Sequence, residues 1–89
     1  MNREEFNESL IQLEQQLEEM NNRLEDAREQ RNSLLRERFD LKEQRRYLRT
    51  QRREALEADN QDRADRLEAR LEELQGKLDE IDSRIEEIE

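Results

Sequence analysis

The sequence contains no cysteine, no histidine and no proline, and each absence excludes a class of structure or chemistry. Without cysteine and histidine there are no disulfide bonds, no thiolate or imidazole catalysis and no zinc site of the Cys/His kind. Without proline, with one glycine and with few β-branched residues, nothing interrupts a helix and little supports a strand. We therefore expect an all-α protein that is not an enzyme and that has no catalytic residues, metal site or cofactor.

Long apolar runs are also absent, and residues 1–6 have no basic head followed by an apolar stretch. No segment approaches the about 20 consecutive apolar residues that span a membrane, and we expect no signal peptide. The expected location is the cytoplasm, with no membrane partner and no small-molecule substrate.

Charged residues make up 48% of the 89-residue chain and hydrophobic residues 30%, which leaves little to build a globular core. This composition borders on that of a disordered chain. The apolar residues recur, however, at alternating steps of three and four, which is the heptad pattern of a coiled coil. The residues that we expect to form this seam and to mediate association are Phe6, Leu10, Leu13, Leu17, Met20, Leu24, Leu34, Leu41, Leu48, Leu67, Leu71, Leu74, Leu78, Ile81, Ile85 and Ile88.

The heptad changes its register at residues 58–62, where Asp59, Asn60 and Asp62 are all suited to begin a new helix. We predict a single coiled-coil unit over 1–89, with one helix at about 3–58, a turn at about 59–62 and a second helix at about 63–89. The predicted fold is an antiparallel coiled coil in which the long and short helices form a hairpin that dimerises. The alternative is one continuous helix in a long coiled-coil dimer, because a helix can absorb this change of register.

Charge distribution favours the hairpin. Residues 28–53 carry a net charge of +6, whereas residues 1–27, which we call the arm, carry −6 and residues 54–89 carry −9. A hairpin lays the acidic C-terminal helix along the basic segment, and an antiparallel second chain brings its acidic arm to the same segment. In that dimer Leu10 lies beside the partner's Leu48, Leu17 beside the partner's Leu41 and Leu24 beside the partner's Leu34.

The basic segment places arginine at four successive a positions of the heptad, while leucine or alanine keeps the d positions. In an antiparallel pair each a position faces a d position of the neighbour, so the arginine stems can lie along leucine. Their guanidinium groups then reach neighbouring carboxylates. These four residues are Arg31, Arg38, Arg45 and Arg52.

Residues 59–64 read D-N-Q-D-R-A, a D-x-x-D-x-A pattern at the expected tip of the hairpin. This pattern resembles the tip of DksA-type regulators, which insert a coiled-coil hairpin into the secondary channel of RNA polymerase. The resemblance implies that Asp59, Asp62 and Ala64 act near the polymerase active centre. It covers six residues, and the cysteine-bearing zinc finger of that family is absent from this chain.

Three functions therefore remain open. The main prediction is a non-enzymatic coiled-coil scaffold or adaptor whose partner is its own copy, as a homodimer or a higher oligomer, and to which another protein can bind. The first alternative is the DksA-like regulator. The second is nucleic-acid binding through the arginine-rich segment 28–53, which the net charge of −9 and the lack of an aromatic stacking platform disfavour.

Overall fold

The computed structural model describes residues 2–89, which form two α-helices and no strand: α1 (Arg3–Glu57) and α2 (Gln61–Ile88). The chain divides into two compact units, Met1–Gln30 and Arg31–Glu89. Glutamate, leucine and arginine are the commonest residues of both helices taken together, and all three have high helix propensity. The predicted all-α fold is confirmed.

The first unit contains the arm and the beginning of α1. The Asn2 side chain accepts a hydrogen bond from the Glu5 backbone N–H at 2.8 Å, and the Asn2 backbone N–H donates back to the Glu5 carboxylate at 3.4 Å. This reciprocal pair is a capping box, which satisfies backbone donors that the first helical turn leaves unpaired. Glu4 and Glu5 also place negative charge at the positive end of the helix dipole.

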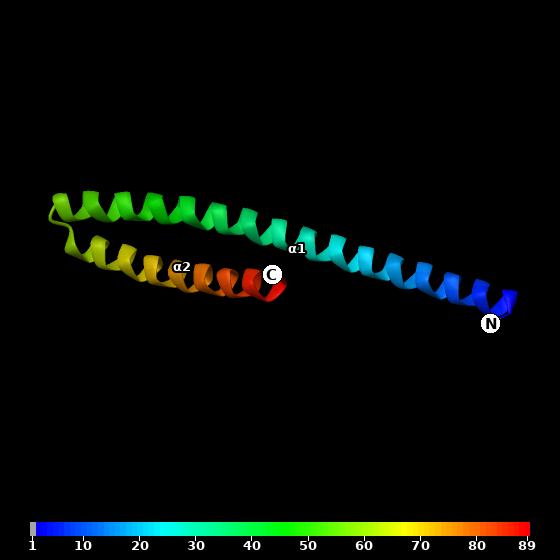
Figure 1. Cartoon of the computed structure of the whole chain (residues 1–89). Coiled ribbons are helices and arrows are strands. Elements are labelled where there is room, and N and C mark those ends of the chain that lie inside the picture. The colour runs from blue at the N-terminus through cyan, green and yellow to red at the C-terminus, as the bar shows by residue number, and fades with distance from the viewer. Residues whose placement is uncertain (1) are drawn as a thin grey trace. The chain divides into compact units, whose positions relative to one another are not determined.

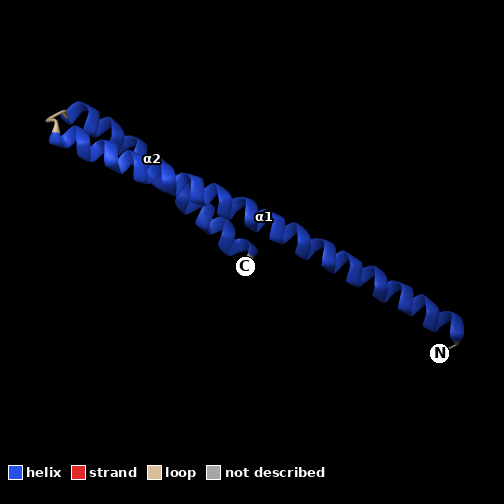
Figure 2. Cartoon of the chain, turned by 90° about the horizontal axis from the view of Figure 1, so that it is seen from above, coloured by secondary structure: helices blue, strands red, loops and turns tan. Residues whose placement is uncertain are grey.

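The second unit is a helical hairpin. The part of α1 that belongs to this unit runs antiparallel to α2, and a short loop joins the two helices (Figure 1). Figure 2 shows this loop as the one non-helical connection between α1 and α2 in the described residues. The hairpin prediction is confirmed, and the continuous-helix alternative is wrong for this chain.

The connection between the helices is a C-terminal cap followed directly by an N-terminal cap. Asp59 has a φ of 55°, in the left-handed region that usually belongs to glycine. The Asn60 N–H donates to the Ala55 carbonyl at 2.8 Å and the Asp59 N–H donates to the Leu56 carbonyl at 3.1 Å, which is the Schellman pattern. The Asn60 side chain then caps α2 by accepting from the Arg63 N–H at 3.2 Å. Of the three capping residues expected from the sequence, the structure uses Asn60.

The core of the hairpin is one face of α2 packed on α1. This face is buried, whereas the α1 residues that cover it are half-buried, with the exception of Ala55 next to the turn. Ala55, Ala64 and Leu67 form a cluster near the turn, and Leu48 packs against it. The buried α2 residues are Ala64, Leu67, Leu74, Leu78, Ile81 and Ile85.

Candidate interaction surfaces

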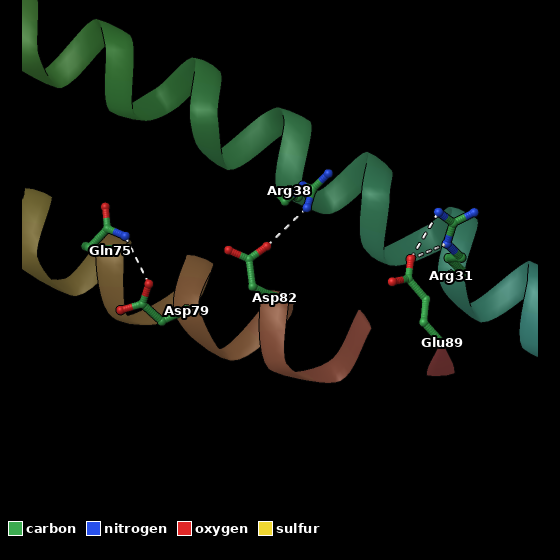
Figure 3. A network of polar contacts seen from close by, with 6 residues as sticks. All are labelled: Arg31, Arg38, Gln75, Asp79, Asp82 and Glu89. Atoms are coloured by element: carbon green, nitrogen blue, oxygen red, sulfur yellow. Dashed lines mark hydrogen bonds and ion pairs between the residues drawn. The ribbon is translucent and has the colours of Figure 1, made fainter. Parts of the chain in front are cut away.

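Four hydrogen-bonded pairs join α1 to α2 at regular intervals, and we call them the arginine ladder. Each arginine guanidinium donates to a side-chain oxygen of α2 at 3.0–3.1 Å, and each step of seven residues along α1 is matched by seven residues back along α2. The two rungs drawn with dashed lines between the helices in Figure 3 are ion pairs of arginine with Asp82 and Glu89. The four pairs are Arg31 with Glu89, Arg38 with Asp82, Arg45 with Gln75 and Arg52 with Glu68.

The ladder defines the register of the hairpin. Its arginines are the four that the sequence places at consecutive a positions, and its acceptors each follow a d position of α2 by one residue. This register sets the a positions of α1 opposite the d positions of α2, so that Arg45 lies opposite Leu74 and Leu41 lies opposite Leu78. The guanidinium groups therefore reach past the apolar seam to the side-chain oxygens at its edge, which are three carboxylates and the Gln75 amide.

The ladder contributes more to register than to stability. Its ion-paired side chains are between 34% and 57% exposed, and ion pairs of this kind contribute roughly 0–1 kcal/mol each. Burial of the α2 leucines and isoleucines stabilises the hairpin more, at about 1.5–3 kcal/mol for each fully buried side chain. Hydrophobic burial holds the hairpin together, and we expect the polar pairs to favour this alignment of its helices.

In the first unit, the predicted seam of the arm is exposed. Its large apolar side chains are between 42% and 59% exposed, because this unit contains no second helix to cover them. Monomeric proteins rarely expose a contiguous apolar stripe of this kind without a partner for it. The seam residues in this exposed set are Phe6, Leu10, Leu13, Leu17, Met20 and Leu24, together with Ile11 beside them.

In the second unit, the seam residues that the sequence predicts are buried or half-buried. Leu34, Leu41, Leu48, Leu71 and Ile88 are half-buried, and the remaining ones on α2 belong to the buried core. The structure therefore separates one predicted seam into a covered part on the hairpin and an uncovered part on the arm.

A groove runs along one edge of the hairpin, between α1 and α2. Its wider part has a volume of about 420 Å³, and a second hollow of about 260 Å³ continues it toward the turn, with Arg70 lining both. Leu48, Leu67 and Leu74 contribute apolar surface to it, and Tyr47 at its margin is 62% exposed. We call this surface the Tyr47 groove; it is lined by Gln44, Tyr47, Leu48, Gln51, Asn60, Arg63, Arg66, Leu67, Arg70, Glu73, Leu74 and Lys77.

The basic rim of the Tyr47 groove was not predicted from the sequence. Arg63, Arg70 and Lys77 are spaced by seven residues on α2, and Arg84 continues the series. These cations lie within residues 54–89, whose net charge is −9, so the net charge of the segment gives no sign of a basic surface. The seven-residue spacing was the signal that could have identified this row, since it places all four on one edge of the helix.

A second basic surface lies on the outer side of α1. A shallow hollow there is lined by Lys42, Arg46, Arg49 and Arg53, together with Glu43, Thr50 and the ladder residue Arg45. Arg46 is 3.8 Å from Glu43, and within the described residues Lys42, Arg49 and Arg53 form no ion pair. The nucleic-acid alternative therefore keeps this face and stays a prediction, while the ladder arginines are bonded to α2.

The tip of the hairpin presents two of the three residues that carry the DksA-type resemblance. Asp59 and Asp62 are exposed, whereas Ala64 is 3% exposed and packs with Ala55 and Leu67 inside the core. Contact of this tip with another protein would therefore involve the two carboxylates.

Within residues 2–89 no group of three or more acidic side chains is arranged to hold a metal ion, and neither helix has an apolar stretch long enough to cross a membrane. The surfaces with distinctive chemistry in the described residues are thus the exposed seam of the arm, the Tyr47 groove, the outer basic face and the acidic tip. Comparisons with protein-family models, with curated proteins and with solved structures find no match to this chain.

Proposed function

We propose that this chain is a non-enzymatic coiled-coil adaptor that associates with its own copy through the seam of the arm. The observation that carries the proposal is the row of large apolar side chains on residues 6–24, each 42–59% exposed. A helix with one apolar stripe gains most of its stability from packing that stripe against a partner. Self-association supplies such a partner at each end of a dimer and leaves the hairpin tips free to contact other proteins.

A second copy suits the arm because the chain carries complementary charge. The arm has a net charge of −6 and residues 28–53 have a net charge of +6. Complementary charge speeds association and disfavours pairings that bring like charges together. These two properties, an uncovered seam and an oppositely charged segment, support self-association over binding to an unrelated acidic helix.

The test is sedimentation equilibrium of the wild type and of the double variant Leu13→Asp with Leu17→Asp. We expect the wild type to be at least dimeric at micromolar concentration. The double variant should dimerise at least about 100-fold more weakly, because two charges then enter the apolar seam and each 1.4 kcal/mol is a factor of ten. Its hairpin should still fold, since neither residue belongs to the second unit.

Gln12→Asp with Gln15→Asp is the matched control, because it adds the same charge to the same helix outside the seam. It should dimerise within a few-fold of the wild type. A wild type that stays monomeric at tens of micromolar would contradict the proposal. So would equal weakening by the control and the seam variant, because that would implicate the charge of the arm and not its seam.

The exposed carboxylates at the tip keep the polymerase-regulator alternative testable. We expect Asp59→Asn with Asp62→Asn to change stability by less than about 1 kcal/mol, because asparagine accepts the left-handed conformation at 59 and the two charges lost near the α2 N-terminus are exposed. Thermal unfolding checks this expectation. In a transcription-initiation assay, an effect of the wild type that this variant abolishes would support the alternative, and a wild type without any effect would end it.

A further inference from the structure

We propose that the arm of one copy lies in the Tyr47 groove of a second copy, so that α1, α2 and the partner's arm form a three-helix bundle. This inference rests on the proposed self-association and names the surface that receives the arm. It starts from the incomplete cover of the hairpin seam, where Leu41 and Leu48 of α1 and Leu71 of α2 are only half-buried. One further helix along the groove would cover these leucines and Tyr47.

The two edges of the seam differ in how they are used. The e edge of α2 carries the acceptors of the arginine ladder and is thereby joined to α1. The g edges of both helices line the Tyr47 groove, with Gln44 and Gln51 from α1 and Arg63, Arg70 and Lys77 from α2. In a three-helix bundle each helix faces its two neighbours through its two edges. The g edges are the pair left for a third helix.

Leu48 connects the groove with the register predicted from the sequence. That register sets Leu10 beside the partner's Leu48, and Leu48 lines the Tyr47 groove and lies opposite Leu71 of α2. Continuing along the heptads, the arm runs antiparallel to the partner's α1 and parallel to its α2. Every layer then contains at least two apolar side chains. Each layer holds one residue of the arm, one of α1 and one of α2. In that order, the layers include Phe6, Arg52 and Leu67; Leu10, Leu48 and Leu71; Leu13, Arg45 and Leu74; Leu17, Leu41 and Leu78; Met20, Arg38 and Ile81; and Leu24, Leu34 and Ile85.

Side-chain size also agrees with this register. At the turn end of the hairpin, Ala55 and Ala64 are both small, and the arm residue in that layer is the long Arg3. At the other end the long side chain is Arg31 of α1, and the arm residue in its layer is Ala27. In these two end layers a small residue on one helix therefore meets a long residue on another, which suits close packing.

The charges at the edges of the arm are complementary to the groove in the same register. A g residue of α2 faces an e residue of a parallel neighbour five positions further on, so Arg70 meets Glu14 of the arm. The g edges of α1 and of the antiparallel arm face each other, so Glu37 meets Arg23. Both pairs bring opposite charges together in the same register that aligns the apolar layers.

The occupant comes from a second copy and not from the arm of the same chain. An arm that entered its own groove would need a reversal of direction between residues 27 and 44. Residues 28–43 contain neither glycine nor proline and are helical throughout. The reciprocal exchange of arms between two copies needs no such reversal, and it uses each arm and each groove once.

Because the chain has no cysteine, cross-linking of the full-length protein tests the register directly. In the variant Gln16→Cys with Gln44→Cys, the two thiols face each other between copies, and mild oxidation should give a disulfide-linked dimer as the main product. The matched control is Gln16→Cys with Arg46→Cys, which moves the second thiol to the outer side of α1. It should give less than about a tenth of the linked dimer.

The outcomes separate the inference from the proposed function. If Gln16→Cys alone cross-links as well as the double variant, the arms pair with each other; the inference is overturned and self-association stands. A wild type that is monomeric overturns both the inference and the proposed function.

Charge exchange gives a second readout: Arg70→Glu should weaken association about tenfold at low salt, and Arg70→Glu with Glu14→Arg should recover most of that loss. Unchanged association of Arg70→Glu would place the arm outside the groove.

Discussion

Replacing Arg38, Arg45 and Arg52 together with glutamate is expected to separate α1 from α2 at low salt. Arg38 and Arg52 are ion-paired with Asp82 and Glu68, and Arg45 donates to Gln75. The exchange replaces attraction by repulsion at the edge of the seam and places short carboxylates where long aliphatic stems had covered leucine. We expect the free energy of unfolding to fall by about 2–4 kcal/mol, because exposed pairs contribute up to about 1 kcal/mol each and like charges cost a similar amount.

Circular dichroism during thermal unfolding measures this loss, and sedimentation should show that dimerisation is lost with it. Salt should restore part of the helicity, since about 1 M salt screens charges beyond roughly 3 Å. The matched control is Arg46→Glu with Arg49→Glu and Arg53→Glu, which makes the same change of charge on the outer face of α1. Equal stability of the two triple variants would contradict the role that the ladder has in the hairpin.

Leucine at the same three ladder positions should have the opposite effect on stability. The variant Arg38→Leu with Arg45→Leu and Arg52→Leu keeps apolar volume at the seam and removes the polar pairs. Replacing ion pairs by packed apolar residues is often neutral or stabilising. The choice of register and partner should become less specific, because the polar pairs that distinguish one alignment from another are gone. We expect a folded protein with a mixed oligomeric state in sedimentation velocity.

The substitution Leu78→Ala is expected to have the largest effect of any single truncation in the hairpin. Leu78 is 2% exposed and is the most deeply buried large side chain in the described residues. Removing a buried leucine side chain costs about 2–5 kcal/mol, through lost burial and through the cavity left behind. Because the seam of the hairpin is narrow, such a loss is a large part of its total stability. Denaturant unfolding followed by circular dichroism measures it.

Leu56→Ala is the control for this prediction, since it makes the same chemical change on α1 at a side chain that is 48% exposed. It should lower the free energy of unfolding by less than about 1 kcal/mol. If Leu78→Ala is no more destabilising than Leu56→Ala, the buried face of α2 is not what holds the hairpin together.

Much of the hairpin could be predicted from local patterns. Heptad spacing identified the seam residues, and the cluster of capping residues at 59–62 located the reversal that the structure places between Glu57 and Gln61. The heptad pattern alone also identified the four ladder arginines, because they occupy consecutive a positions, but not the α2 residues that accept their hydrogen bonds. These features depend on residues close together in the sequence, where helix periodicity and capping chemistry act.

The sequence by itself therefore determined the helical class, the apolar face of each helix and the site of the turn. Only the tertiary structure decided which part of the seam is covered, because Leu17 and Leu78 have equivalent heptad patterns and differ in burial only through their neighbours. The Tyr47 groove and its basic rim likewise could be identified only from the structure, because they combine residues of α1 and α2. Gln44 and Arg70, for example, both line the groove and are 26 positions apart in the sequence. Periodicity shows which face of a helix is apolar, but the element that covers this face is selected by burial and charge over the whole chain.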